Sequence, residues 1–286
     1  MKLQKIQSLF GLSLLIGGLA FAPPCADDDD GTTTDNAETS GDPTESGDGD
    51  GDGDGDGDGD GDGDGDGDGD GDGDTNIRVI HLGVNVPAVD VFVNGGEPAA
   101  ITDLAFRLGT PYVTLPEDDY TFDIALAGGA IGDAVLTVGP LSLEADAFYT
   151  AAAVGNLNDS NVEVLALGDN YDGIGDNVRI QVVHAASSVG QVDIWNVTDP
   201  ANPAPLLENV DYKAFADLDL PVGDYVIGLD VDDDATPDLT FNAGLATLGV
   251  PAGSFLNVFA SDDPDDNVAL VAQLGDGSTL PILPNP

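Results

Sequence analysis

The chain has 286 residues, a formal net charge of −48 at pH 7 and one cysteine. Such an acidic chain repels nucleic-acid phosphates and anionic membrane surfaces, so neither is expected as a partner, and one cysteine excludes an internal disulfide. An acidic, lysine-poor surface is common in proteins adapted to high salt and keeps an exported protein soluble, and we expect a monomer.

Residues 1–24 have the layout of a secretory signal peptide. Lys2 and Lys5 precede an apolar run over residues 9–21, which is too short to span a bilayer comfortably. Cys25 follows directly, at the position where bacterial lipoproteins are acylated, although two prolines before it depart from the usual box of small residues. We expect an exported lipoprotein of the cell surface or outer membrane, whose lipid is its only membrane contact. The alternative is ordinary cleavage after Ala22 and secretion.

Residues 25–75 form an acidic segment that has no means of making a core. Residues 47–74 are an unbroken Gly-Asp alternation, and apolar side chains are almost absent before them. Nothing there offsets the entropy of ordering the backbone, and repulsion between the carboxylates extends the chain. We therefore interpret this segment as a disordered tether. The alternative, a calcium-binding tract, is disfavoured because alternating glycine supplies no preorganised oxygens for a tight site.

From residue 76 the sequence changes to short β-type runs separated by turn residues, without sustained helical periodicity. The first half predicts eight strands, at residues 76–82, 88–94, 103–108, 112–115, 120–126, 134–143, 148–154 and 162–167. The second half repeats this plan. We therefore predict an all-β protein with two tandem antiparallel β-sandwiches of immunoglobulin-like appearance, at residues 76–170 and 177–286.

The repeat is visible in two pairs of phrases. Ile77-Arg78-Val79-Ile80-His81 is answered by Ile180-Gln181-Val182-Val183-His184, and in both copies an aspartate, Asp90 or Asp193, follows the histidine at the same interval. A Leu-Pro phrase that ends in tyrosine also occurs in each half, at residues 115–120 and 220–225. A period of roughly a hundred residues has the size of a domain and exceeds that of a solenoid repeat.

Several phrases of the first half together resemble the domain-of-unknown-function family numbered 4397. They are Arg78-Val79-Ile80-His81, Val89-Asp90-Val91-Phe92-Val93-Asn94-Gly95, Phe106, Tyr112-Val113-Thr114-Leu115-Pro116 and Phe148-Tyr149-Thr150-Ala151-Ala152-Ala153-Val154-Gly155. The resemblance implies a β-rich domain, often in tandem, in exported and surface-anchored proteins, and it implies no activity. Two departures concern a turn and an ion pair: Glu117-Asp118 replaces a small residue and glycine, and Gln181 replaces the arginine of the first copy.

The two histidines, His81 and His184, each precede an aspartate, an arrangement that could suggest a catalytic dyad. No nucleophile recurs beside both, and no Gly-x-Ser-x-Gly turn exists, so we predict that both pairs are structural and that the protein is not an enzyme. A hydrolase based on His184 and Asp193 remains the least favoured alternative. A zinc site is also disfavoured, because the histidines fall in different predicted domains.

The strongest local motif is the acidic run of residues 230–239. Oxygen-bearing side chains recur at the spacing by which a short loop wraps calcium, at Asp230, Asp232, Asp234 and Asp238. The backbone carbonyl of Thr236 is the fifth candidate ligand. The run resembles the calcium loops of propeller-type and thrombospondin-type repeats. Ala235 occupies the sixth position, where glycine is usual, and an acidic hairpin tip without an ion is the alternative interpretation.

We thus predict a non-catalytic, surface-displayed binding or structural module of the cell envelope on an acidic stalk. Calcium is the one cofactor expected, and the partner on the surface or in the matrix is not identified by the sequence. The second hypothesis is a carbohydrate-binding or adhesive module, which would require Trp195, Tyr212 or Tyr225 to form an exposed platform.

Overall fold

The computed structural model describes residues 73–286, in which every regular element is a strand except two 3₁₀ helices, η1 (Ile131–Asp133) and η2 (Leu157–Asp159). The predicted signal peptide, Cys25 and nearly all of the predicted tether lie outside the described residues. Within residues 73–286, no helix has the length and apolarity that crossing a membrane requires. All of the strands belong to one compact unit.

The first half folds into two four-stranded sheets. Its strands are β1 (Asp74–His81), β2 (Val89–Val93), β3 (Ile101–Leu104), β4 (Val113–Pro116), β5 (Asp118–Leu126), β6 (Leu136–Leu143), β7 (Phe148–Val154) and β8 (Glu163–Gly168). One sheet has the order β4-β1-β7-β8 and the other has the order β3-β2-β5-β6.

The second half has the same topology with one strand added. Its strands are β9 (Asn177–Ala185), β10 (Val192–Asn196), β11 (Ala204–Val210), β12 (Phe215–Pro221), β13 (Asp224–Asp230), β14 (Leu239–Gly244), β15 (Phe255–Asp262), β16 (Val268–Gln273) and β17 (Thr279–Ile282). The sheet orders are β12-β9-β15-β16-β17 and β11-β10-β13-β14. The predicted all-β fold with two tandem β-sandwiches is confirmed.

Several details differ from the prediction. One strand pair in each sandwich is parallel, β1 with β7 and β9 with β15, so the sheets are not wholly antiparallel. The predicted strand at residues 103–108 is wrong, because β3 ends at Leu104. Asp103 has a left-handed backbone (φ 54°) and donates its N–H to Asp90 at an irregularity of the β2–β3 pairing, which ends where Leu104 faces Val89, the first residue of β2. The first strand begins at Asp74, two residues before the predicted boundary.

Each sandwich has its own apolar core, and the shared Leu-Pro-to-Tyr phrase has a structural explanation. The hydroxyl group of Tyr120 donates a 2.8 Å hydrogen bond to the carbonyl of Pro116, and Tyr225 bonds Pro221 in the same way at 2.8 Å. Each tyrosine thereby fixes the turn between the strand that ends in the Leu-Pro pair and the next one. This arrangement is similar to the tyrosine corner of immunoglobulin-like sandwiches.

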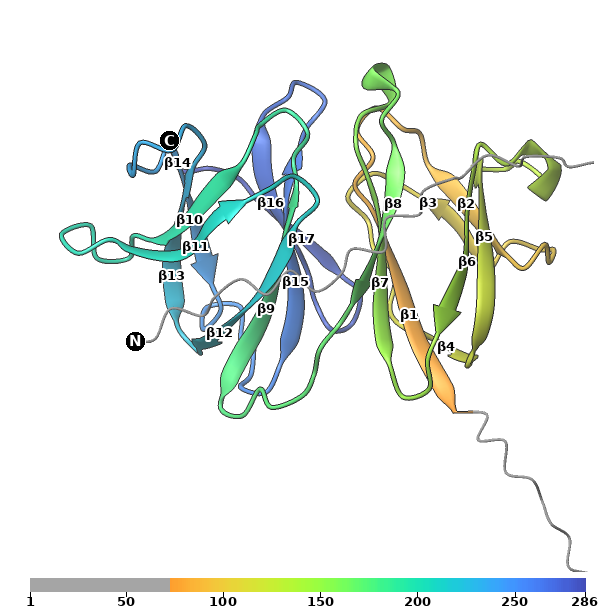
Figure 1. Ribbon diagram of the computed structural model, residues 1–286, viewed down its shortest axis with the longest axis horizontal. Helices are drawn as coiled ribbons and strands as arrows, with labels where there is room; N and C mark the ends of the chain where they lie inside the picture. The colour runs from red at the N-terminus through yellow and green to blue at the C-terminus, as the bar shows by residue number, and fades with distance from the viewer. Residues whose placement is uncertain (1–72) are drawn as a thin grey trace, which may run out of the picture. The chain divides into compact units, whose positions relative to one another are not determined.

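A third apolar cluster joins the two sandwiches. It consists of buried residues from both halves: Ile80, Leu82, Ala152, Val154, Leu167, Val183, Ala185, Phe259 and Val271. In Figure 1, β1, β7 and β8 lie on the side of the first sandwich that is nearest β9, β15 and β16. One sheet of each sandwich is therefore buried on both of its faces, which explains the nearly continuous apolar runs in β9 and β16.

Polar side chains cross this apolar interface in a nearly symmetric way. Arg78 and Gln181 occupy equivalent positions, opposite Thr150 on β7 and opposite Asn257 on β15. Arg78 donates to the carbonyl of Leu274 at 2.9 Å, and Gln181 donates to that of Gly168 at 2.8 Å. Thr150 and Asn257 also contact each other across the interface, since the Asn257 amide donates to Thr150 Oγ1 at 2.9 Å. The interface thus relates the sandwiches by a pseudo-two-fold axis.

Candidate metal site in the second sandwich

The predicted calcium loop is the hairpin between β13 and β14. β13 ends at Asp230, and pairing resumes where Leu239 faces Leu229. Within the turn, Asp233 and Ala235 have left-handed backbones, with φ values of 60° and 63°. Ala235 therefore adopts the conformation for which glycine is usual at this position.

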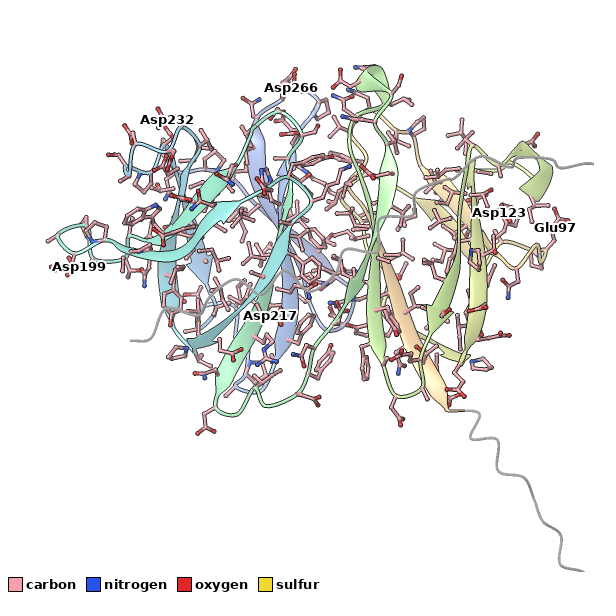
Figure 2. The ribbon with its side chains drawn as sticks, in the orientation of Figure 1. Glu97, Asp123, Asp199, Asp217, Asp232 and Asp266 are labelled. Carbon is pink, nitrogen blue, oxygen red and sulfur yellow. The ribbon has the colours of Figure 1, made fainter. Side chains whose placement is uncertain are left out.

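Three carboxylates converge in this hairpin. Asp230, Asp232 and Asp238 each place one oxygen so that all three oxygens lie within 4.8 Å of one another. Asp230 is only 1 % exposed, whereas Asp232 and Asp238 are exposed. Figure 2 shows Asp232 on the outer loop of the second sandwich, beside β14. Carboxylate oxygens are the ligands that hard divalent cations prefer.

The hydrogen bonds of Asp230 leave one of its oxygens without a partner. Asp230 Oδ1 accepts the N–H groups of Asp232 at 3.2 Å and of Asp233 at 2.9 Å. Asp230 Oδ2 is buried and has no hydrogen-bond partner among the described residues. Asp238 Oδ2 accepts the N–H of Val231 at 2.9 Å, which ties the two ends of the hairpin together. A buried carboxylate oxygen without a partner carries a substantial desolvation cost.

The structure brings together three of the four predicted carboxylate ligands. Asp234 lies outside this cluster, and its carboxylate accepts the N–H of Thr236 at 2.8 Å to stabilise the turn. The negative charge of Asp234 nevertheless acts on the cluster: it is the main cause that raises the pKa of Asp232, ahead of desolvation and the charges of Asp238 and Asp230. The hairpin therefore concentrates negative charge.

The two histidines are used in loop contacts. His81 Nδ1 accepts the N–H of Gly83 at 3.2 Å, and His81 Nε2 donates to the carbonyl of Pro87 at 3.2 Å. In the second copy, His184 Nε2 donates to the carbonyl of Gly190 at 2.6 Å. Burial lowers the pKa of both histidines below the ordinary value of 6.5, which favours the neutral ring.

The aspartates that follow the histidines hold the next strand. Asp90 accepts the N–H of Asp103 at 2.7 Å, and Asp193 accepts that of Asn209 at 2.6 Å. Each aspartate therefore forms a hydrogen bond to the neighbouring irregular strand, Asp90 to β3 and Asp193 to β11. Asp193 and His184 do not share a hydrogen-bond partner, because His184 Nε2 donates to the carbonyl of Gly190.

The three aromatic residues of the adhesive hypothesis are each half-buried. The indole N–H of Trp195 and the hydroxyl group of Tyr212 lie in the interior, and the hydroxyl group of Tyr225 is bonded to Pro221. Tyr212 packs edge-on against His184, with ring centroids 5.9 Å apart. The three rings are therefore only partly exposed, and the polar atoms of Trp195 and Tyr212 are buried, which disfavours the exposed platform that the hypothesis requires.

Sequence reasoning did not find the buried polar cluster at the interface between the sandwiches. Arg78 lies 3.5 Å from Asp169, and both side chains are fully buried. Asp169 also accepts the hydroxyl groups of Thr150 at 2.6 Å and Tyr112 at 2.5 Å, while the Arg78 guanidinium lies 4.6 Å from the centre of the Tyr112 ring. The available signal was a charged residue within an otherwise apolar strand, Ile77-Arg78-Val79-Ile80.

The comparisons with known proteins give a match to a family model and distant likenesses among solved structures. The family model described as "Domain of unknown function (DUF4397)" matches residues 75–195, which cover the first sandwich and the chain into β10. No curated protein matches the chain. Among solved structures, "The Bacillus anthracis TIE protein" is similar at 12% sequence identity and a TM-score of 0.20. That match covers 74% of this chain and 44% of the other, so this chain spans less than half the length of that protein.

Proposed function

Because residues 75–195 belong to the DUF4397 family, whose description assigns no activity, we propose a function from the physical character of the chain. The protein is a non-catalytic binding or structural module of the cell envelope. It is displayed at the cell surface on the acidic stalk of residues 26–75 and is anchored by lipid on Cys25. Its second sandwich is a further copy of the family's domain and contains a calcium site.

The observation that carries this proposal is the buried interface between the sandwiches. The Arg78 and Gln181 side chains cross it in opposite directions, each to a carbonyl group of the other sandwich. Binding to a preorganised body loses less conformational entropy than binding to two loosely linked domains. This arrangement suits a protein that presents a fixed surface at the end of a stalk.

The use of the histidines supports a role without catalysis. Both rings are buried, both donate to loop carbonyl groups, and burial lowers the pKa of both. A general base must reach its substrate, and these rings are occupied by the protein's own backbone.

The second sandwich is supported as a family copy by its strand order, which repeats that of the first for eight strands. Equivalent residues also make equivalent contacts, as the Tyr120 and Tyr225 turns do. β17 is the one addition, and it pairs with β16 at the edge that β8 leaves open in the first sandwich.

The partner is proposed to be a component of the cell surface or matrix that is neither a nucleic acid nor a lipid headgroup. From residue 76 the chain contains four cationic side chains, of Arg78, Arg107, Arg179 and Lys213. Arg78 is buried, Arg179 pairs with Asp219, and Lys213 pairs with Glu163. The remaining surface is acidic, and repulsion between molecules favours a monomer.

The test of display is to produce the whole chain in a bacterium that processes lipoproteins, beside Cys25→Ser. We expect the wild-type protein in the membrane fraction and Cys25→Ser in the medium. Added protease should cut within the stalk and release an intact fragment that begins near residue 73. If Cys25→Ser stays with the membrane, or if neither protein is reached by protease in intact cells, the proposed anchor and display are wrong.

A further inference from the structure

The hairpin at the candidate metal site differs from its counterpart in the first sandwich at one buried position. Asp90 on β2 faces Ala125 on β5, and Asp193 on β10 faces Asp230 on β13. Ala125 and Asp230 are therefore equivalent, and both are buried, at 0 % and 1 % exposure. A small apolar residue in one copy is replaced by a buried carboxylate in the other.

This replacement redirects a hydrogen bond. In the first sandwich, the Gly128 N–H donates to Asp90 Oδ2 at 2.8 Å and so ties the hairpin to β2. The equivalent amide in the second sandwich, three residues after Asp230, belongs to Asp233, and it donates to Asp230 at 2.9 Å. Asp193 keeps only its bond to the Asn209 amide, which corresponds to the bond from Asp103 to Asp90.

In the second sandwich the carboxylates of Asp193 and Asp230 therefore lie on strand positions that face each other. No cationic side chain of residues 73–286 pairs with either of them. Like charges that face each other across a strand pair destabilise it. Among residues 73–286, the contacts of the cationic side chains lie elsewhere: Arg78 with Asp169, Arg107 with the Asp262 carbonyl, Arg179 with Asp219, and Lys213 with Glu163. A positive charge from outside the chain would stabilise the buried Asp230 carboxylate, whose second oxygen has no hydrogen-bond partner among the described residues.

We propose that a calcium ion bound by Asp230, Asp232 and Asp238 supplies this charge and replaces the Gly128 amide as the link between hairpin and β10. The inference rests on the calcium site included in the proposed function and adds its ligands and its structural task. Asp193 is a positioning residue, opposite the ion-binding Asp230.

The chemistry of the site suits calcium. Three carboxylate oxygens that lie within 4.8 Å of one another can share one divalent cation. Calcium also accepts irregular coordination completed by water and carbonyl groups, which an exposed hairpin provides, while magnesium retains its own water shell.

Trp195 offers a probe that is specific for this hairpin. It is the single tryptophan of the chain, and it faces Gly228, two residues before Asp230. Trp195 and Asp193 are two residues apart on β10, so both side chains lie on the face of the sheet that carries Asp230. Terbium, a luminescent substitute for calcium, would receive energy from this ring when it is bound at the hairpin.

The experiment compares the whole mature chain with Asp230→Ala, which installs the residue of the first sandwich, and with Asp266→Asn, an exposed acidic residue of another loop (Figure 2). Ionic strength is held high and constant. In the wild type and in Asp266→Asn, we expect tryptophan-sensitised terbium emission that calcium displaces. At about 10 mM calcium we also expect a rise in unfolding temperature of roughly 3–10 °C.

Asp230→Ala should lose both responses while unfolding, without calcium, at a temperature equal to or above that of the wild type, because the buried charge is gone. That result also shows that the variant folds. The proposal is overturned if Asp230→Ala retains the emission and the calcium shift, or if magnesium raises the unfolding temperature as much as calcium does. Either outcome leaves the membrane fractionation of Cys25→Ser unaffected, so failure of this site is distinguishable from failure of the display proposal.

Discussion

At the scale of single residues, Arg78 has the most demanding environment in the described part of the chain. It is fully buried, and its charge is balanced by Asp169 and by the ring of Tyr112. Removing one member of such a pair leaves the other charge buried without compensation. The ion pair thus contributes less as a source of net stability than as a constraint on how the two sandwiches fit.

Arg78→Ala should therefore lower the free energy of unfolding by about 3–5 kcal/mol. Lys213→Ala is the matched control: its ion pair with Glu163 joins side chains that are 39% and 41% exposed, and such pairs contribute less than about 1 kcal/mol. Urea unfolding of both variants measures the difference. Equal losses in the two variants would contradict the role assigned to Arg78.

The histidines give the protein a defined pH dependence. Burial lowers their pKa in the folded state below the ordinary value of 6.5, so the unfolded chain binds protons first as the pH falls. Their contribution is fully present above pH 6.5 and is lost below it. Asp217, whose pKa burial raises, acts with the opposite sign at lower pH.

We expect the free energy of unfolding to decrease as the pH falls below about 6.5, and His184→Gln to reduce the slope by roughly half, since two histidines titrate there. Denaturant titrations at several pH values test this. A slope that is unchanged in His184→Gln would show that the ring is not kept neutral by the fold.

At the scale of the elements, the Tyr-to-Pro turns provide a direct test of the repeat. Tyr120→Phe should cost about 1 kcal/mol of stability, the ordinary contribution of one hydrogen bond, because the Pro116 carbonyl loses its donor. Tyr225→Phe should cost less, since Tyr225 is only half-buried whereas Tyr120 is buried, so water can replace the lost hydrogen bond more readily. Urea unfolding measures both changes, and a larger loss in Tyr225→Phe would contradict the account.

Most strands could be predicted because the turn residues between them are chemically explicit. β7, for example, was predicted with the bounds that the structure has. β3 could not be predicted, because its end depends on a side chain distant in sequence: Asp90 captures the Asp103 amide and the chain then turns away. Local propensity contains no information on such a contact.

The candidate metal site was partly accessible for a similar reason. The spacing of Asp230, Asp232 and Asp238 indicated an ion-binding loop, and the structure brings these three residues together. The role of Asp234 within the turn was not predictable, since an acidic side chain may bind an ion or cap a local amide at the same spacing. The pairing of Asp230 with Asp193 and of Ala125 with Asp90 required the strand register, which sequence alone does not give.

At the scale of the whole molecule, the interface between the sandwiches decides how the protein behaves. The period of the repeat suggested two domains joined by a short connection. The structure adds that the apolar cluster of Ile80, Val183 and their neighbours is contributed by both halves. Its polar contacts follow a pseudo-two-fold axis, because each half donates one side-chain hydrogen bond to a backbone carbonyl of the other: Arg78 to Leu274 and Gln181 to Gly168.

Calorimetry of the whole mature chain, with calcium present, tests most directly whether the two sandwiches form one body. A buried shared interface predicts a single transition in which the calorimetric and van't Hoff enthalpies agree. Arg78→Ala should split this transition in two, because the interface is weakened more than either core. Two separate transitions in the wild-type protein would contradict the account, because they would show that the two sandwiches unfold as independent domains.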